Sequence, residues 1–242
     1  MSTGSHTLET RRTSSATTFV NVVFAAAILI APIAFTVGGL LDPVVHVTNG
    51  EANIAAFATA NPFTNALHLS AFVLASFLLP ISIVGMARLA MQGSPWLAVS
   101  GAVLGLIGWL PFSALTAQED LTLQMARLGG GDLLATLWEQ FNDDPIMTFY
   151  LVVYIAGHLA AYVVLAIALR RARVIPAWAA WILAASTPLT LAFFATRQRN
   201  ETVGLLMELL FCATFIVGSV PVAYASLHYV PCSPEGATTR EV

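Results

Sequence analysis

One apolar segment of the sequence carries a regular series of hydroxyl and imidazole groups. Tyr150, Tyr154, His158 and Tyr162 recur at every fourth position. On an α-helix such residues share one face, which drifts by about 40° at each step. Aligned phenols and an imidazole could hydrogen-bond the polar head of a ligand, or relay protons because histidine titrates near neutral pH. The alternative is that the stripe faces neighbouring helices and bonds their hydroxyl and carbonyl groups.

A single carboxylate interrupts the last apolar segment. Glu208 lies within 203–229, about a turn and a half from its start. A carboxylate buried in a membrane either pairs with a cation or takes up a proton. Arg197 or Arg199, just ahead of the segment, could extend to Glu208 as a structural ion pair. Glu208 could otherwise bind a proton or a cation, and both interpretations remain open.

Histidines elsewhere raise the question of a metal ion or a haem. His68 enters the second apolar segment at nearly the depth of the buried carboxylate, and Asp42 and His46 follow the first. These ligand types suit zinc or copper, but nothing in their spacing defines a site. The helical rise of about 1.5 Å per residue predicts a depth difference of roughly 10 Å between His68 and His158, too large for two ligands of one haem iron. We therefore predict no metal and no cofactor, and we assign no catalytic residue.

The elements that position these groups follow from the composition. The 242 residues are 57% hydrophobic and 10% charged, with 13 acidic and 10 basic side chains, and every basic one is arginine. Soluble domains carry about 25% charged residues, so an ordinary soluble enzyme is excluded. The net charge of −3 provides no basic field for nucleic acid, and the apolar content excludes a disordered chain. The composition indicates an integral membrane protein whose partner is the lipid bilayer.

Six segments are long enough to cross a bilayer core as helices, and they do not alternate as barrel strands would. We therefore predict an all-α bundle of six transmembrane helices over 18–230, with polar tails on both sides. The first segment exceeds the length of a signal-peptide core. We interpret 1–17 as a disordered cytoplasmic tail and 231–242 as a second cytoplasmic tail. The predicted spans are 18–40, 65–88, 95–117, 147–169, 176–195 and 203–229.

The arginines predict how the chain is oriented. Arginine is enriched on the cytoplasmic side of membrane proteins, and seven of the ten fall on one side if both termini are cytoplasmic. Those seven are Arg11, Arg12, Arg88, Arg170, Arg171, Arg173 and Arg240. Arg197 and Arg199 oppose this assignment, so 176–195 could instead be re-entrant. We expect a multi-pass protein of the cell membrane with an acidic, elaborated outer face.

The longest predicted loop, 118–146, contains an amphipathic stretch. Leu133, Leu134, Leu137, Trp138 and Phe141 share one helical face over 132–142. Three glycines at 129–131 break the chain ahead of Asp132, which could cap the helix. This short helix lies either flat on the outer membrane surface or on top of the bundle. Residues 50–60 predict a second, weaker helix of the same kind.

The third span carries a small-residue motif. Gly101 and Gly105 are four residues apart and Gly108 follows. Such spacing lets another backbone approach closely, either within the chain or in a homo-oligomer. Prolines in five of the six spans predict kinks.

The turn between the fourth and fifth spans has a distinctive sequence. Residues 171–178 read Arg-Ala-Arg-Val-Ile-Pro-Ala-Trp. With the polar N-terminal tail and the Ala-, Leu- and Val-rich spans, this turn resembles small six-span bacterial membrane proteins of unknown function. The resemblance implies a helical membrane bundle and transfers no catalytic residue.

Three functions are compatible with these features. The first, which we favour, is a non-enzymatic membrane protein that binds a small apolar or lipid-like ligand, or a partner, through its outer face. The second is a proton-coupled transporter that uses Glu208 and the stripe around His158. The third is a membrane redox protein that holds haem or quinone. The candidate ligand- or proton-binding residues are Glu208, His158, Tyr150, Tyr154, Tyr162 and His68.

Overall fold

The structure is entirely helical over the residues that it describes. The computed structural model describes residues 4–44, 49–197 and 199–230 and, of these, the side chains of all but 4–14 and 201; no strand occurs among them. The prediction of an all-α bundle is therefore confirmed. The helices are α1 (Gly4–Leu40), α2 (Gly50–Thr59), α3 (Pro62–Ala90), α4 (Pro95–Trp109), α5 (Phe112–Arg127), α6 (Asp132–Asn142), α7 (Pro145–Arg171), α8 (Ala177–Thr196) and α9 (Glu201–Leu227).

Six stretches of this fold are long and apolar enough to cross a bilayer, so the chain is a multi-pass membrane protein. The fifth of them, Ala177–Thr196, is one continuous helix, which favours a full crossing over a re-entrant segment. The six are Ser15–Leu40, Pro62–Ala90, Pro95–Arg127, Pro145–Arg171, Ala177–Thr196 and Thr202–Leu227.

Two boundaries differ from those expected from the sequence. Helix α1 begins at Gly4, so the polar segment interpreted as a disordered tail is helical from that residue, whereas 231–242 lies outside the described residues. The third span continues to Arg127, and 118–127, expected in a loop, is helical because this part of α5 packs against α2 and α3. Of the five prolines inside the predicted spans, only Pro111 separates two helices, because it follows the end of α4 and precedes α5. The other four, Pro32, Pro80, Pro188 and Pro221, lie inside continuous helices.

Polar caps mark where several helices start. The side chain of Asn61 accepts the N–H of Phe63, and that of Asp144 accepts the N–H of Ile146, each directly before a proline at the first helical position. A proline there loses no helical hydrogen bond. Asn200 caps α9 in the same way by accepting the N–H of Val203. In this charge-poor chain, short amide and carboxylate side chains therefore set the helix starts.

The glycines of α4 serve packing within the chain. A Cβ atom at Gly101 would lie 2.7 Å from the side chain of Leu165 on α7, and one at Gly105 would lie 2.7 Å from that of Ile83 on α3. Both glycines therefore let α4 approach its neighbours closely. The structure uses them inside one molecule and gives no support to a homo-oligomer formed through them.

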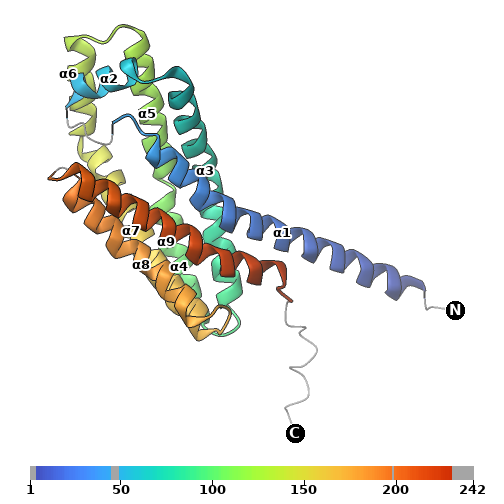
Figure 1. Cartoon of the computed structure of the whole chain (residues 1–242). Helices are drawn as coiled ribbons and strands as arrows, with labels where there is room; N and C mark the ends of the chain where they lie inside the picture. The colour runs from blue at the N-terminus through green and yellow to red at the C-terminus, as the bar shows by residue number, and fades with distance from the viewer. Residues whose placement is uncertain (1–3, 45–48, 198, 231–242) are drawn as a thin grey trace.

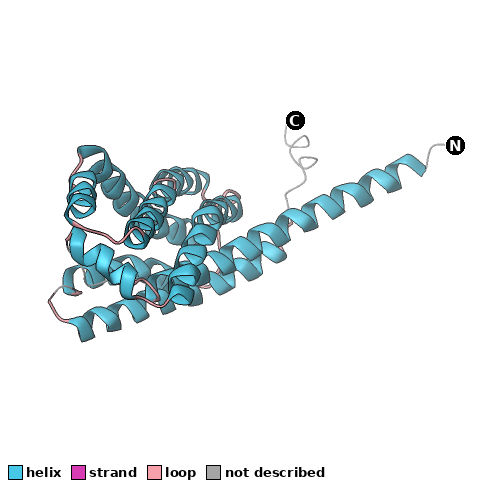
Figure 2. Cartoon of the chain, turned by 90° about the horizontal axis from the view of Figure 1, so that it is seen from above, coloured by secondary structure: helices cyan, strands magenta, loops and turns pink. Residues whose placement is uncertain are grey.

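The two ends of the bundle differ in charge. Figures 1 and 2 show α1 and α9 running side by side, with the start of α1 and the end of α9 on one side of the molecule. At that side Arg88 donates to Asn21 at 3.0 Å and lies 4.3 Å from the ring centroid of Tyr229. The turn after α3 there touches the turn after α7. We call the end that holds Arg88, Arg170, Arg171 and Arg173 the arginine-rich end.

The opposite end carries two short helices, α2 and α6, which pack on each other beside α5 (Figure 1). Trp138 of α6 donates its indole N–H to Thr122 of α5 at 3.0 Å, and Glu139 accepts the N–H of Gly50 at 3.2 Å. Helix α6 thus contacts the bundle through these bonds, while Leu133, Leu137 and Phe141 of its apolar face stay exposed, so both arrangements expected for it are compatible with the structure. Its cap is Gly131 at φ 109°, so Asp132 is the first helical residue and not the cap.

Candidate functional site

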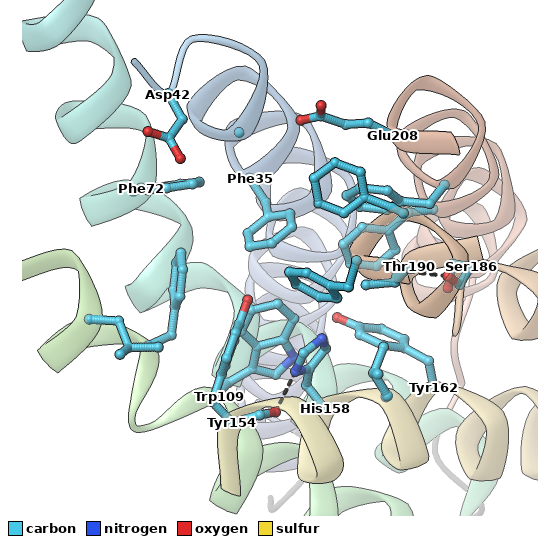
Figure 3. A pocket seen from close by; sticks show the side chains of 18 of the residues that line it. Phe35, Asp42, Phe72, Trp109, Tyr154, His158, Tyr162, Ser186, Thr190 and Glu208 are labelled. Atoms are coloured by element: carbon cyan, nitrogen blue, oxygen red, sulfur yellow. Dashed lines mark hydrogen bonds between the residues drawn. The ribbon is translucent and has the colours of Figure 1, made fainter. Parts of the chain in front are cut away.

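A central cavity of about 210 Å³ lies between the long helices. Side chains from α1, α3, α4, α5, α7, α8 and α9 line it, and most of these are aromatic (Figure 3). Four of the six candidate residues from the sequence reach this one space. They are Tyr154, His158, Tyr162 and Glu208.

The floor of the cavity is a cluster of rings around His158. The His158 ring stacks on Tyr154 with centroids 4.4 Å apart and lies 4.7 Å from the Trp109 ring. Its Nδ1 bonds to the backbone carbonyl of Tyr154 (Figure 3). Because a carbonyl oxygen only accepts, Nδ1 carries the proton, and Nε2 of the neutral ring is an acceptor. His158 is therefore held in one tautomer at the cavity wall.

Two hydrogen-bond donors of the floor are buried without a well-formed bond. The indole Nε1 of Trp109 and the hydroxyl of Tyr162 interact with each other, and this hydroxyl also interacts with Ser82. Neither donor, however, has a partner with good hydrogen-bond geometry among the described residues. Their residues are 1% and 3% exposed. Most buried polar groups in proteins are paired, and an unpaired one costs about 1–3 kcal/mol. Both donors line the cavity, so a ligand with an acceptor atom could satisfy them.

Tyr150 does not join this cluster. Its side chain is 39% exposed and is not part of the cavity wall. The reason is geometric, because the i, i+4 series drifts about 40° per step around the helix axis, and Tyr150 and Tyr162 lie three steps apart. The stripe therefore divides, with Tyr154, His158 and Tyr162 inward and Tyr150 outward.

Four charged residues line the other end of the cavity, and we call this part the mouth. They are Asp42, Glu119, Arg197 and Glu208. Figure 3 places Asp42 and Glu208 at the same end of the cavity, away from the floor. Arg197 caps α8, where burial lowers the pKa of its guanidinium and the charges of Asp42 and Glu208 raise it. Arg197, not Arg199, is therefore the arginine that is coupled to Glu208.

His68 lies behind the mouth rather than in it. Its side chain is fully buried. Nδ1 donates to the carbonyl of Gly38 at 2.7 Å, and Nε2 lies 3.1 Å from Oε2 of Glu119. Since Nδ1 must carry a proton, contact between Nε2 and a carboxyl oxygen requires one further proton on either His68 or Glu119. The pair joins α1, α3 and α5, and Glu119 connects it to the cavity.

The sequence reasoning missed two residues of this site, Trp109 and Glu119. Glu119 was assigned to a loop because the third span was expected to end at 117. The polar residues after that position could have indicated its true length, since α5 alternates buried and exposed residues with a helical period. Trp109 had no comparable signal in a segment that is apolar on every side.

The histidines do not form a metal or haem site in the described part of the chain. No three His, Cys, Asp or Glu side chains there are grouped closely enough to hold a metal ion, and His46 lies outside the described residues. His158 faces the cavity, whereas both ring nitrogens of His68 face protein atoms. The two rings therefore share no space where one iron could bind.

Comparisons with known proteins do not assign the chain to a family. No protein-family model, curated protein or solved structure matches the chain.

Proposed function

We propose that this multi-pass membrane protein binds a small amphipathic ligand in the central cavity. The observation that carries the proposal is the convergence of Tyr154, His158, Tyr162 and Glu208 on one space. An aromatic wall with a few polar groups is typical of ligand sites. We expect the apolar body of the ligand to contact the aromatic wall and its head to lie at the mouth.

The size and position of the cavity suit a compact apolar molecule. An engineered apolar cavity of about 150 Å³ holds benzene, and this one measures about 210 Å³. Two wall residues, Leu151 of α7 and Phe194 of α8, are also 44% and 41% exposed. The wall thus extends to the surface between α7 and α8, where a bilayer surrounds the bundle, and an apolar ligand has a route from the lipid.

The charges of the mouth favour a cationic head. Three carboxylates and one guanidinium line it. Glu119 lies 3.1 Å from Nε2 of His68, and if this pair is neutral overall, Asp42 and Glu208 remain against Arg197, with a net negative charge. The surrounding aromatic rings also attract cations through their π faces. An ammonium group is therefore favoured over a carboxylate.

Glu208→Gln is expected to lower the affinity for a cationic probe about tenfold, a loss of about 1.4 kcal/mol, because it removes one charge from the mouth. The probe is 2-naphthylmethylamine, and 2-ethylnaphthalene and 2-naphthoic acid are its neutral and anionic counterparts. Binding to the protein in nanodiscs is measured by calorimetry. Wild type should prefer the amine, then the neutral compound, then the acid.

The matched control is Asp120→Asn, which removes an exposed charge next to Glu119 but outside the cavity. It should leave the order and the affinities unchanged. Equal affinity of all three compounds for wild type, or loss of amine binding in both variants alike, would contradict the proposal.

Tyr162→Phe tests the floor of the cavity. We expect the variant to fold about as stably as wild type, because the buried hydroxyl that it removes makes no hydrogen bond of good geometry with a described residue. Wild type should bind 2-acetylnaphthalene up to about tenfold more tightly than 2-ethylnaphthalene, since the ketone accepts a hydrogen bond. In the variant this preference should shrink. A preference that is unchanged would show that the hydroxyl does not contact the ligand.

A second candidate, a proton-coupled carrier, is favoured by the contact between Glu119 and His68. The carboxylate of Glu119, a wall residue of the cavity, lies 3.1 Å from a ring nitrogen of a fully buried histidine, so ligand occupancy and protonation could be linked. Uptake of 2-naphthylmethylamine into proteoliposomes with an imposed proton gradient distinguishes a carrier from a binding protein. Uptake that is unaffected by Glu208→Gln and by His158→Ala would contradict the carrier.

The orientation that we propose places the mouth outside and both termini in the cytoplasm of a cell membrane. Its support is the position of Arg88, Arg170, Arg171 and Arg173 at the end opposite the mouth, as cytoplasmic arginine enrichment requires. A cysteine introduced at position 91, which is 44% exposed, checks this orientation, because a membrane-impermeant reagent should label it only from the cytoplasmic side.

A further inference from the structure

A second hollow lies at the arginine-rich end, far along α7 from the mouth. Arg170, Arg171 and Arg173 line it together with Trp181 and small or aliphatic residues of α7 and α8. Its volume is about 520 Å³, and all three arginines are exposed. We call it the arginine groove.

The groove carries uncompensated positive charge. None of its three arginines forms an ion pair with a carboxylate among the described residues, and no acidic side chain lines it. Arg170 instead lies over the Trp181 ring, 5.0 Å from its centroid. Guanidinium groups bind phosphate oxygens through paired N–H donors. The chemistry of the groove therefore matches a phosphate group.

Arg173 occupies a backbone position where glycine is the usual residue. Its φ is 57°, and it follows the end of α7 in a turn where Val174 N–H donates to Leu169 and Arg173 N–H donates to Arg170. This hydrogen-bond pattern usually has glycine at the left-handed position, because a side chain there is strained. A strained arginine at the rim indicates a use for its side chain beyond ending the helix.

The groove also lies at the depth of lipid head groups. Trp178 and Trp181 are 53% and 56% exposed at the start of α8, and tryptophan is enriched at the boundary between hydrocarbon and water. Basic pockets between transmembrane helices on that boundary bind anionic lipid heads. We propose that the arginine groove binds the phosphate head group of an anionic phospholipid. This inference does not depend on the function proposed for the central cavity.

Thermal unfolding of the full chain in a neutral detergent tests the proposal. Phosphatidylglycerol should raise the melting temperature, and phosphatidylcholine with the same acyl chains should raise it by less than half as much. Arg173→Gly should melt at the same or a higher temperature without lipid, because it relieves the strained backbone, and should lose at least half of the phosphatidylglycerol shift. Native mass spectrometry should show fewer bound phosphatidylglycerol molecules on this variant.

The matched control is Arg127→Gln, which removes an exposed arginine at the other end of the bundle and should keep the full shift. Equal shifts with both lipids, or a full shift in Arg173→Gly, would overturn the proposal. A shift of the same size with inorganic phosphate alone would assign the groove to a soluble anion and would overturn the lipid assignment.

Discussion

Replacing Gly108 with alanine is expected to destabilise the folded bundle by about 3 kcal/mol, the upper end of the usual cost of overpacking. Helices α4 and α7 cross here with no room for a side chain. A Cβ atom at Gly108 would overlap the backbone nitrogen of His158 and lie 2.6 Å from the carbonyl carbon of Gly157. Backbone atoms cannot rotate away as a side chain can, so the two helices would have to separate. Their separation would also displace His158 from the floor of the cavity.

The effect is measured by titrating the protein in mixed micelles with sodium dodecyl sulfate and following helix loss. Gly101→Ala is the matched control, because it adds the same atom to the same helix but meets the side chain of Leu165, which can move. It should destabilise the protein by less than half as much as Gly108→Ala. Equal losses would mean that the backbone contact has no special role.

His68→Leu is expected to destabilise the protein by about 2 kcal/mol, because it leaves the carbonyl of Gly38 unpaired, and an unpaired buried polar group costs about 1–3 kcal/mol. The substitution removes the bond to this carbonyl and the contact with Glu119, at a histidine that is fully buried and a carboxylate that is 26% exposed. Leucine fills a similar volume, so the loss reports on polar contacts more than on packing. The same titration measures this loss.

The double variant His68→Leu, Glu119→Leu provides the control. Replacing both partners of a buried polar pair with apolar groups is often close to neutral. The double variant should therefore recover at least half of the loss seen in the single one. Additive losses would show that the two side chains act independently, and their contact would then have no energetic role.

Local patterns in the sequence predicted the elements well and their limits less well. The six spans, the helices over 50–60 and 132–142, and the break at the three glycines all appear in the structure. These features depend on apolar length, helical period and glycine conformation, which are properties of short segments. The expected third span ended too early because α5 is amphipathic beyond 117. Its apolar face is buried by the neighbouring α2 and α3, and hydropathy does not detect such a contact.

The candidate site was predicted only in part. The sequence singled out Tyr154, His158, Tyr162 and Glu208, which all line the cavity. It could not separate them from Tyr150, because a four-residue spacing defines a face of one helix but not the width of that face toward its neighbours. It also could not link Trp109 to the site, because every face of this segment is apolar and hydropathy does not show which face is buried.

By itself the sequence determined that this protein is a helical membrane bundle with a single carboxylate far inside the last span, and it predicts that most of the arginines lie on one side. Only the tertiary structure decided that Glu208 is coupled to Arg197 instead of Arg199, and that Glu119 contacts His68. It also assigned the glycines of α4 to contacts inside the chain. The physical reason is that periodicity orients a side chain about its own helix axis. Which helix lies opposite, and how closely, depends on the packing of all of them together.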